Sequence, residues 1–228
     1  MGETVEFPSN GTTGHGYLAH ASEGAGPGVV VIQEWWGLVP HIKDVCERLA
    51  AEGFTALAPD LYRGASAKEP DEAGKLMMAM NIEHAAKDIA GAVDFLQGHD
   101  SVRGDGIGVV GFCMGGGLAL FAATIKPDDV TAAVSFYGVI PWEAARPDYS
   151  KLQAAVQGHY AENDGFAGPP AVQALQHELK GLGKECELFV YPGTEHAFFN
   201  DTRPEVYDEE AARQAWVRTL EFLRAKLG

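Results

Sequence analysis

A cysteine set among glycines is the residue whose type and spacing point most clearly to chemistry. Residues 107–117 read Ile-Gly-Val-Val-Gly-Phe-Cys-Met-Gly-Gly-Gly, an apolar run that leads into a glycine-rich helix start. Gly-x-Cys-x-Gly is a nucleophile-elbow pattern, with cysteine where serine is usual. Because a thiolate attacks carbonyl carbon well, Cys113 is predicted to be an acyl-transfer nucleophile. A glycine-eased packing contact between strand and helix is the structural alternative.

A thiol nucleophile needs a base to take its proton and a third group to orient that base. In elbow enzymes the order along the chain is nucleophile, acid, histidine, each in a loop beyond the carboxyl end of a strand. Asp164 and His196 follow the expected strands 154–160 and 187–191 in that order. We therefore expect a triad of Cys113, His196 and Asp164.

Two neighbouring residues offer other assignments. Glu162 lies two positions before Asp164 and is the competing acid. Asp164 is preferred because of its position in the loop before Gly165. His159 falls inside or at the end of a strand and is interpreted as structural or as support for the site.

Backbone N–H groups near the cysteine could stabilise an oxyanion. The start of a helix favours negative charge, so the N–H of Met114 is one expected donor. The second donor normally follows an early strand, which makes the N–H of Trp35 the candidate. Trp36 is assigned either to the substrate pocket or to the core, where tryptophan is common.

Glu34 is unusual because it stands at the end of a strand predicted to be buried. A buried carboxylate is costly unless it has a partner. Either it pairs with an arginine such as Arg63, or it faces Cys113 as part of the site.

The elements that must position these residues alternate between strand and helix. A hairpin over 4–19 precedes a continuous β-branched run at 28–32, which is typical of a strand buried on both faces of a parallel sheet. Further strands are predicted at 54–59, 130–136, 154–160 and 187–191, and helices at 41–52, 71–97 with a break near Asn81, 169–182 and 205–227. The fold class is therefore α/β, a mainly parallel twisted sheet with helices on both faces. Residues 137–152 are too few for a cap domain.

Size and charge narrow the possible functions. The chain has 228 residues, is 46% hydrophobic and carries a formal net charge of -15. This length suits one core, so a single domain over 1–228 is expected. The negative charge argues against nucleic acid and anionic membrane surfaces as partners. Because the start of the chain is polar and no stretch is apolar enough to span a bilayer, we expect a cytoplasmic protein.

The cysteines and histidines do not suggest a disulfide or a metal site. Cys46, Cys113 and Cys186 are widely spaced and lack Cys-x-x-Cys pairs. Cys46 is predicted to be buried on a helix face, and Cys186 to be inert. The eight histidines are dispersed without a His-Glu-x-x-His motif. No metal and no cofactor are expected.

Several motifs together resemble the dienelactone hydrolase family of α/β-hydrolases. They are Gln-Glu-Trp-Trp-Gly at 33–37, Ala-Pro-Asp-Leu-Tyr at 58–62, Gly-Phe-Cys-Met-Gly-Gly at 111–116, and the loops with Asp164 and with Gly-Thr-Glu-His at 193–196. The resemblance implies an α/β-hydrolase fold and the cofactor-independent hydrolysis of small esters or lactones through a thioester. It also implies the same triad, with a glutamate that holds the resting thiol and takes part in its activation.

The chain departs from the family at the arginines that bind a substrate carboxylate. The family position four residues after the histidine is Asn200, and residues 65–97 contain no arginine. Arg63 or Arg203 could substitute. The expected pocket residues are Trp35, Trp36, Tyr137, Phe198 and Phe199, which suggest small apolar or aromatic substrates.

Two further expectations concern class and assembly. The alternative from another class is a non-catalytic or redox-sensing protein in which Cys113 is oxidised. In either case we expect a monomer or a weak homodimer.

Overall fold

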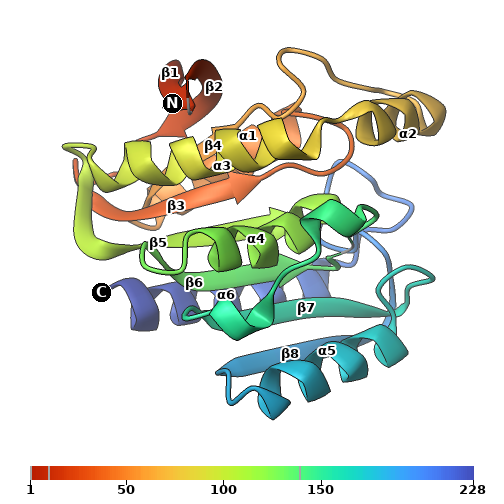
Figure 1. Cartoon of the computed structure of the whole chain (residues 1–228). Helices are drawn as coiled ribbons and strands as arrows, with labels where there is room; N and C mark the ends of the chain where they lie inside the picture. Colours follow the sequence, from red (N-terminus) through yellow and green to blue (C-terminus); the bar gives the residue numbers. More distant parts are fainter. Residues whose placement is uncertain (1, 10, 139) are drawn as a thin grey trace.

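Helices pack on both faces of one eight-stranded sheet in the computed structural model, which describes residues 2–9, 11–138 and 140–228 (Figure 1). The strands are β1 (Glu3–Ser9), β2 (Thr12–Ala19), β3 (Gly26–Ile32), β4 (Thr55–Pro59), β5 (Val102–Phe112), β6 (Val130–Phe136), β7 (Ala155–Asn163) and β8 (Cys186–Glu195). The helices are α1 (Pro40–Ala51), α2 (Pro70–Ala79), α3 (Ile82–Gln97), α4 (Met114–Ile125), α5 (Pro169–Gly181) and α6 (Glu209–Leu227).

The strand order is β1-β2-β4-β3-β5-β6-β7-β8. The β1–β2 hairpin is antiparallel and adds to β4, and every pair from β4 to β8 is parallel. The predicted α/β class, the edge hairpin and the helix break are confirmed. Asn81 caps α3, because its side chain accepts a hydrogen bond from the His84 N–H at 3.0 Å.

The sheet is buried on both sides, as the β-branched run of β3 predicts. Val29 and Val31 pack on the face covered by α1 and α6, and Val30 and Ile32 pack on the face covered by α3 and α4 (Figure 1). Alternate residues of a strand point to opposite faces, so a strand between two helical layers is apolar throughout.

Between β6 and β7, the described residues 137–138 and 140–154 form no helical domain. They contain two single turns of 3-10 helix, Glu143–Ala145 and Tyr149–Lys151. This segment lies over the α4 side of the sheet (Figure 1). The loops after β5, β7 and β8 meet at the carboxyl edge of the sheet, where the candidate catalytic residues are found.

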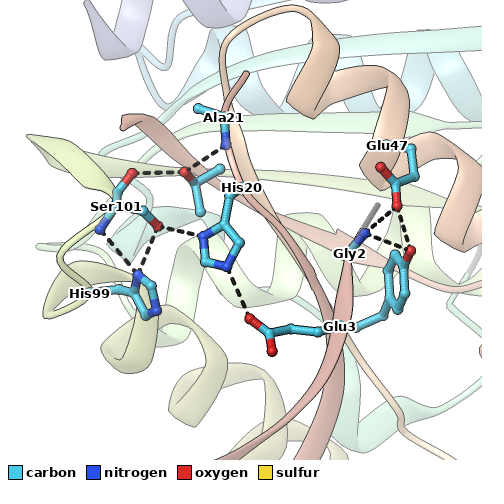
Figure 2. Close-up of polar contacts among 9 residues, drawn as sticks. Gly2, Glu3, His20, Ala21, Glu47, His99 and Ser101 are labelled. Atoms are coloured by element: carbon cyan, nitrogen blue, oxygen red, sulfur yellow. Dashed lines mark hydrogen bonds and ion pairs between the residues drawn. The ribbon is translucent and has the colours of Figure 1, made fainter. Parts of the chain in front are cut away.

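A polar network ties the hairpin to the opposite, amino edge of the sheet. The Ser101 hydroxyl lies 2.8 Å from Nδ1 of His99 and 3.1 Å from Nδ1 of His20, and Nε2 of His20 lies 3.2 Å from the Glu3 carboxylate (Figure 2). In a catalytic triad the serine contacts Nε2 and the acid contacts Nδ1, which is the reverse of this arrangement. Because His99 also engages the hydroxyl, we assign the network a structural role.

Candidate active site

Cys113 occupies a strained turn between β5 and α4. Its φ is +55°, in a region that residues other than glycine rarely adopt. Around it the backbone approaches itself closely: a Cβ on Gly111 would overlap the Gly115 carbonyl, and one on Gly115 would overlap the Gln33 carbonyl. The glycines are therefore required for close packing, and this packing places the thiol at the apex of the turn.

The other two cysteines lie in settings that suppress reactivity. Burial raises the pKa of the Cys46 thiol far above its ordinary value, and burial also raises the pKa of Cys186. A thiol with a raised pKa is a poor nucleophile at neutral pH because little thiolate is present. Cys113, which is partly exposed, is thus the candidate nucleophile.

Asp164 and His196 meet across the gap between the β7 and β8 loops. Nδ1 of His196 lies 2.6 Å from Oδ2 of Asp164. Oδ1 of Asp164 accepts hydrogen bonds from the backbone N–H groups of Phe166 at 2.8 Å and Ala167 at 3.0 Å. Burial acts to raise the pKa of Asp164, but the bond to His196 and these N–H groups outweigh burial and hold that pKa below its usual value. The carboxylate therefore stays ionised and fixes the imidazole.

The competing acid, Glu162, is turned away from this pair. Its side chain is exposed, and its carboxylate accepts a hydrogen bond from the Gly193 N–H at 2.8 Å. Of the two carboxylates, Asp164 is the one in contact with His196, as the sequence order predicts.

Cys113 lines the same pocket as His196 and contributes to raising the pKa of that ring. Because Nδ1 is engaged by Asp164, Nε2 is the ring nitrogen that remains for the sulfur. Burial acts to lower the pKa of His196, but its interactions with Asp164 and Cys113 raise it to about 10. At neutral pH such a ring holds a proton, and this is the state in which it pairs with a thiolate.

Glu34 is buried and held by two uncharged donors. Nδ2 of Asn200 donates to Oε2 at 2.8 Å, and the hydroxyl of Tyr137 lies 3.4 Å from Oε1. Arg63, considered above as a partner of this carboxylate, instead lies 3.4 Å from Asp88. The suggested pairing of Glu34 with Arg63 is therefore wrong, because the arginine extends toward the hairpin side of the fold.

Tyr137 links the glutamate with the sulfur. Burial raises its pKa well above the ordinary value, and the charges of Glu34 and Cys113 raise it further. Its ring centroid lies 5.0 Å from that of His196. Tyr137 has a φ of +39°, so strained backbone is found beyond β6 as well as beyond β5. Its side chain is completely buried, so it lies behind the reacting groups as a neighbour of the glutamate.

The two candidate oxyanion donors border the sulfur from different strands. Met114 is the first residue of α4, where backbone N–H groups have no partner within the helix. Trp35 follows β3 and lines the pocket. Trp36 packs against Trp35 with ring centroids 5.1 Å apart, and the guanidinium of Arg203 lies 5.6 Å from the Trp36 ring centre. Trp36 thus supports the pocket wall from behind.

A pocket of about 760 Å³ opens beside Cys113 and His196. Trp35, Phe166 and Arg203 surround the part next to the sulfur. From there the pocket continues along α4, beneath the 140–149 segment, and reaches α5. Phe166 is largely exposed at its rim, with its ring edge-on to that of His196.

Of the six predicted substrate-binding residues, only Arg203 is among those that line the pocket, and Trp36, Tyr137, Phe198, Phe199 and Arg63 are not. Phe198 and Phe199 are fully buried in the core between the sheet and the α1 and α6 layer, and Phe199 stacks on Phe112. The backbone reverses at Ala197, where φ is +69°, and this turn directs both rings inward. Arg63 lies outside the pocket, in contact with Asp88.

Some pocket residues have no signal in the sequence that marks them as functional. Phe166, Trp142, Arg146 and the α5 residues come from loops and from an exposed helix face. Only Phe166 offered a clue, since it lies two positions after the predicted acid.

The described residues show neither a membrane span nor a metal cluster. Within them, no helix is both long and apolar enough to cross a bilayer. Over the same residues, no three His, Cys, Asp or Glu side chains gather as metal ligands.

Comparison with known proteins identifies the family of the chain. Residues 15–227 match the model of the dienelactone hydrolase family. Over the full length of both chains, the sequence is 39% identical to "Protein usf" of Aquifex pyrophilus and 35% identical to "Putative carboxymethylenebutenolidase" of Aquifex aeolicus.

The fold matches as well. A crystal structure described as "Putative Dienelactone Hydrolase" from Klebsiella pneumoniae superimposes with a TM-score of 0.88 at 28% identity, covering 98% of each chain. The predicted α/β-hydrolase fold is confirmed by this match together with the observed strand order.

Proposed function

The chain belongs to the dienelactone hydrolase family, whose fold and hydrolase class it shares, and from this premise we propose that Cys113, His196 and Asp164 cleave a carboxylic ester or lactone. The observation that supports the proposal is the 2.6 Å contact between Asp164 and His196 beside a pocket that both His196 and Cys113 line. No cofactor is needed for this chemistry, because the nucleophile, base and orienting acid are side chains.

Acylation proceeds from the ion pair in which Nε2 of His196 holds the proton of the Cys113 thiol. The thiolate attacks the ester carbonyl carbon, and the carbonyl π electrons move onto oxygen. The N–H groups of Met114 and Trp35 donate hydrogen bonds to that oxyanion. When the carbonyl re-forms, the C–O bond to the alcohol breaks, and His196 returns its proton to the leaving oxygen. A thioester on Cys113 and a free alcohol result, or a single ring-opened acyl chain in the case of a lactone.

Deacylation repeats these steps with water as the nucleophile. His196 takes a proton from water, and the resulting hydroxide attacks the thioester carbon. Collapse of the second tetrahedral intermediate expels the thiolate and releases the carboxylic acid. Asp164 keeps its charge throughout and stabilises the imidazolium.

Glu34 is assigned the control of the resting thiol. A carboxylate near a sulfur disfavours the free thiolate, because two negative charges in a poorly solvated site repel each other. The charges of Glu34 and Cys113 both raise the pKa of Tyr137, which supports a short distance between the carboxylate and the sulfur. In the resting state Glu34 thus opposes the thiolate–imidazolium pair, until the carboxylate moves or accepts the proton.

Replacement of Cys113 tests the mechanism. C113A should abolish turnover of p-nitrophenyl acetate, and mass spectrometry of the unmodified protein mixed with a slow ester should detect an acyl adduct on Cys113. Retention of most activity by C113A would exclude the thioester route. A protein that is oxidised at Cys113 but never acylated would support the redox-sensing alternative.

A reducing compartment suits this chemistry. The cysteines at positions 46, 113 and 186 are all free, and a catalytic thiolate survives best where thiols are kept reduced. We therefore place the protein in the cytoplasm, with a small-molecule ester or lactone as its partner.

A further inference from the structure

The pocket extends well past the reacting sulfur. Beyond Gly117 at the start of α4, it continues between the 140–149 segment and α5. Side chains that line this distal part include Leu120, Ile140, Tyr149, Val172, Ala174 and Leu175. We call it the α5 groove.

The α5 groove is an apolar surface with charge only at its borders. Glu143, Arg146 and Glu178 lie where it meets solvent, and the last two are next to the buried Tyr149. At the other end, the cation of Arg203 is already paired with Glu205 at 2.9 Å. The interior of the groove therefore favours a group that is neutral and apolar along its length.

The volume of the pocket indicates how large this group is. Pockets of roughly 300–1,000 Å³ typically enclose ligands of drug size. The whole pocket, about 760 Å³, lies in the upper half of that range. A small ring or an acetyl ester bound at Cys113 would leave the α5 groove filled with water against apolar walls, which is unfavourable.

We propose that the substrate is an ester or lactone that carries an extended apolar substituent, either a medium-length alkyl chain or an aryl group, and that this substituent lies in the α5 groove. The inference rests on the proposed function and specifies the substrate class of the same site. Each methylene moved from water into an apolar site improves binding by roughly fourfold. The length of the apolar substituent should accordingly dominate the substrate specificity.

The primary test is a series of p-nitrophenyl esters from acetate to decanoate, measured as kcat/KM. We expect a rise of at least 30-fold between acetate and an optimum at six to ten carbons. A parallel series of alkyl acetates varies the length of the alcohol instead. A rise of kcat/KM in that series would show that the groove holds the alcohol part of the ester. Rates that stay flat in both series would overturn the proposal.

A groove-filling variant links the length dependence to α5. Ala174 is exposed and lines the groove, so A174W should fill it without disturbing the core. Gln173, its exposed neighbour on α5, does not line the groove, and Q173W is the matched control. A174W should lower kcat/KM for octanoate at least tenfold and leave that for acetate within twofold, and Q173W should change neither.

The outcomes separate this inference from the function on which it rests. If A174W and Q173W hydrolyse long esters equally well, the groove assignment is wrong. If C113A still hydrolyses acetate, the proposed mechanism fails whatever the length dependence. Thermal unfolding of both tryptophan variants confirms that any loss is not a loss of folding.

Discussion

The side-chain amide of Asn200 donates a hydrogen bond to the buried carboxylate of Glu34 at 2.8 Å, across 166 residues of sequence. Asn200 stands at the position where the family resemblance implies an arginine. The carboxylate is thus held here by a neutral donor. Asn200 is itself held in place by the next turn, since its Oδ1 accepts hydrogen bonds from the N–H and hydroxyl of Thr202. The loop after His196 therefore positions the base and Glu34 together.

Removal of the Asn200 amide should destabilise the fold. N200A leaves a buried carboxylate oxygen without its donor, and hydrogen bonds to charged groups contribute about 1.5–3 kcal/mol. We expect the free energy of unfolding in urea to fall by an amount in that range. T202V removes only the hydroxyl bond to Oδ1 of Asn200, so its free energy of unfolding should fall by less. Equal falls in the two variants would show that the amide stabilises the turn and not the carboxylate of Glu34.

Neutralisation of Glu34 should make the thiol more reactive. In E34Q the negative charge that opposes the thiolate is gone, so alkylation of Cys113 by iodoacetamide at pH 7 should accelerate at least threefold. Y137F is the control, because it keeps the carboxylate and removes only a 3.4 Å contact. An unchanged or slower alkylation rate in E34Q would remove Glu34 from control of the thiol.

The two carboxylates of the β7 loop should differ sharply in their effect on turnover. D164N removes the charge that orients His196, and the corresponding loss in serine-based triads is about 10⁴-fold in kcat. E162Q changes an exposed side chain that contacts only backbone, so kcat should stay within threefold. Steady-state rates with p-nitrophenyl acetate measure kcat for both variants. Comparable losses of kcat would mean that Asp164 is not the acid that orients His196.

Stability should depend on pH through His196. Its pKa is about 10 in the folded protein, against about 6.5 in an unfolded chain. The folded state binds this proton more tightly, so the stabilisation is complete below about pH 6.5 and is lost as the pH rises through about 10.

Urea unfolding of the unmodified protein and of H196Q should therefore be compared at pH 6 and pH 10.5. The unmodified protein should be the more stable one at pH 6, and the difference should shrink at pH 10.5. A difference that is constant with pH would mean that the pKa of His196 is not raised in the folded state.

The sequence by itself determined the order of elements and the positions of the reactive groups. Strand and helix periodicities depend on which faces are buried, and the β3 run and the Asn81 break are local signals of this kind. The glycines of the elbow are also a local signal, because a Cβ at Gly111 or Gly115 would overlap the backbone of the turn around Cys113. Asp164 and His196 could be assigned because parallel strands bring their carboxyl-end loops to one edge of the sheet.

Only the tertiary structure decided which side chains meet beyond that edge. Phe198 and Phe199 are as apolar as pocket residues, but the turn at Ala197 sends them into the core. The pairing of Asn200 with Glu34 and the α5 wall of the pocket join segments far apart in the chain. Apolar periodicity identifies a buried face but not its neighbour, because loop geometry and packing set those contacts.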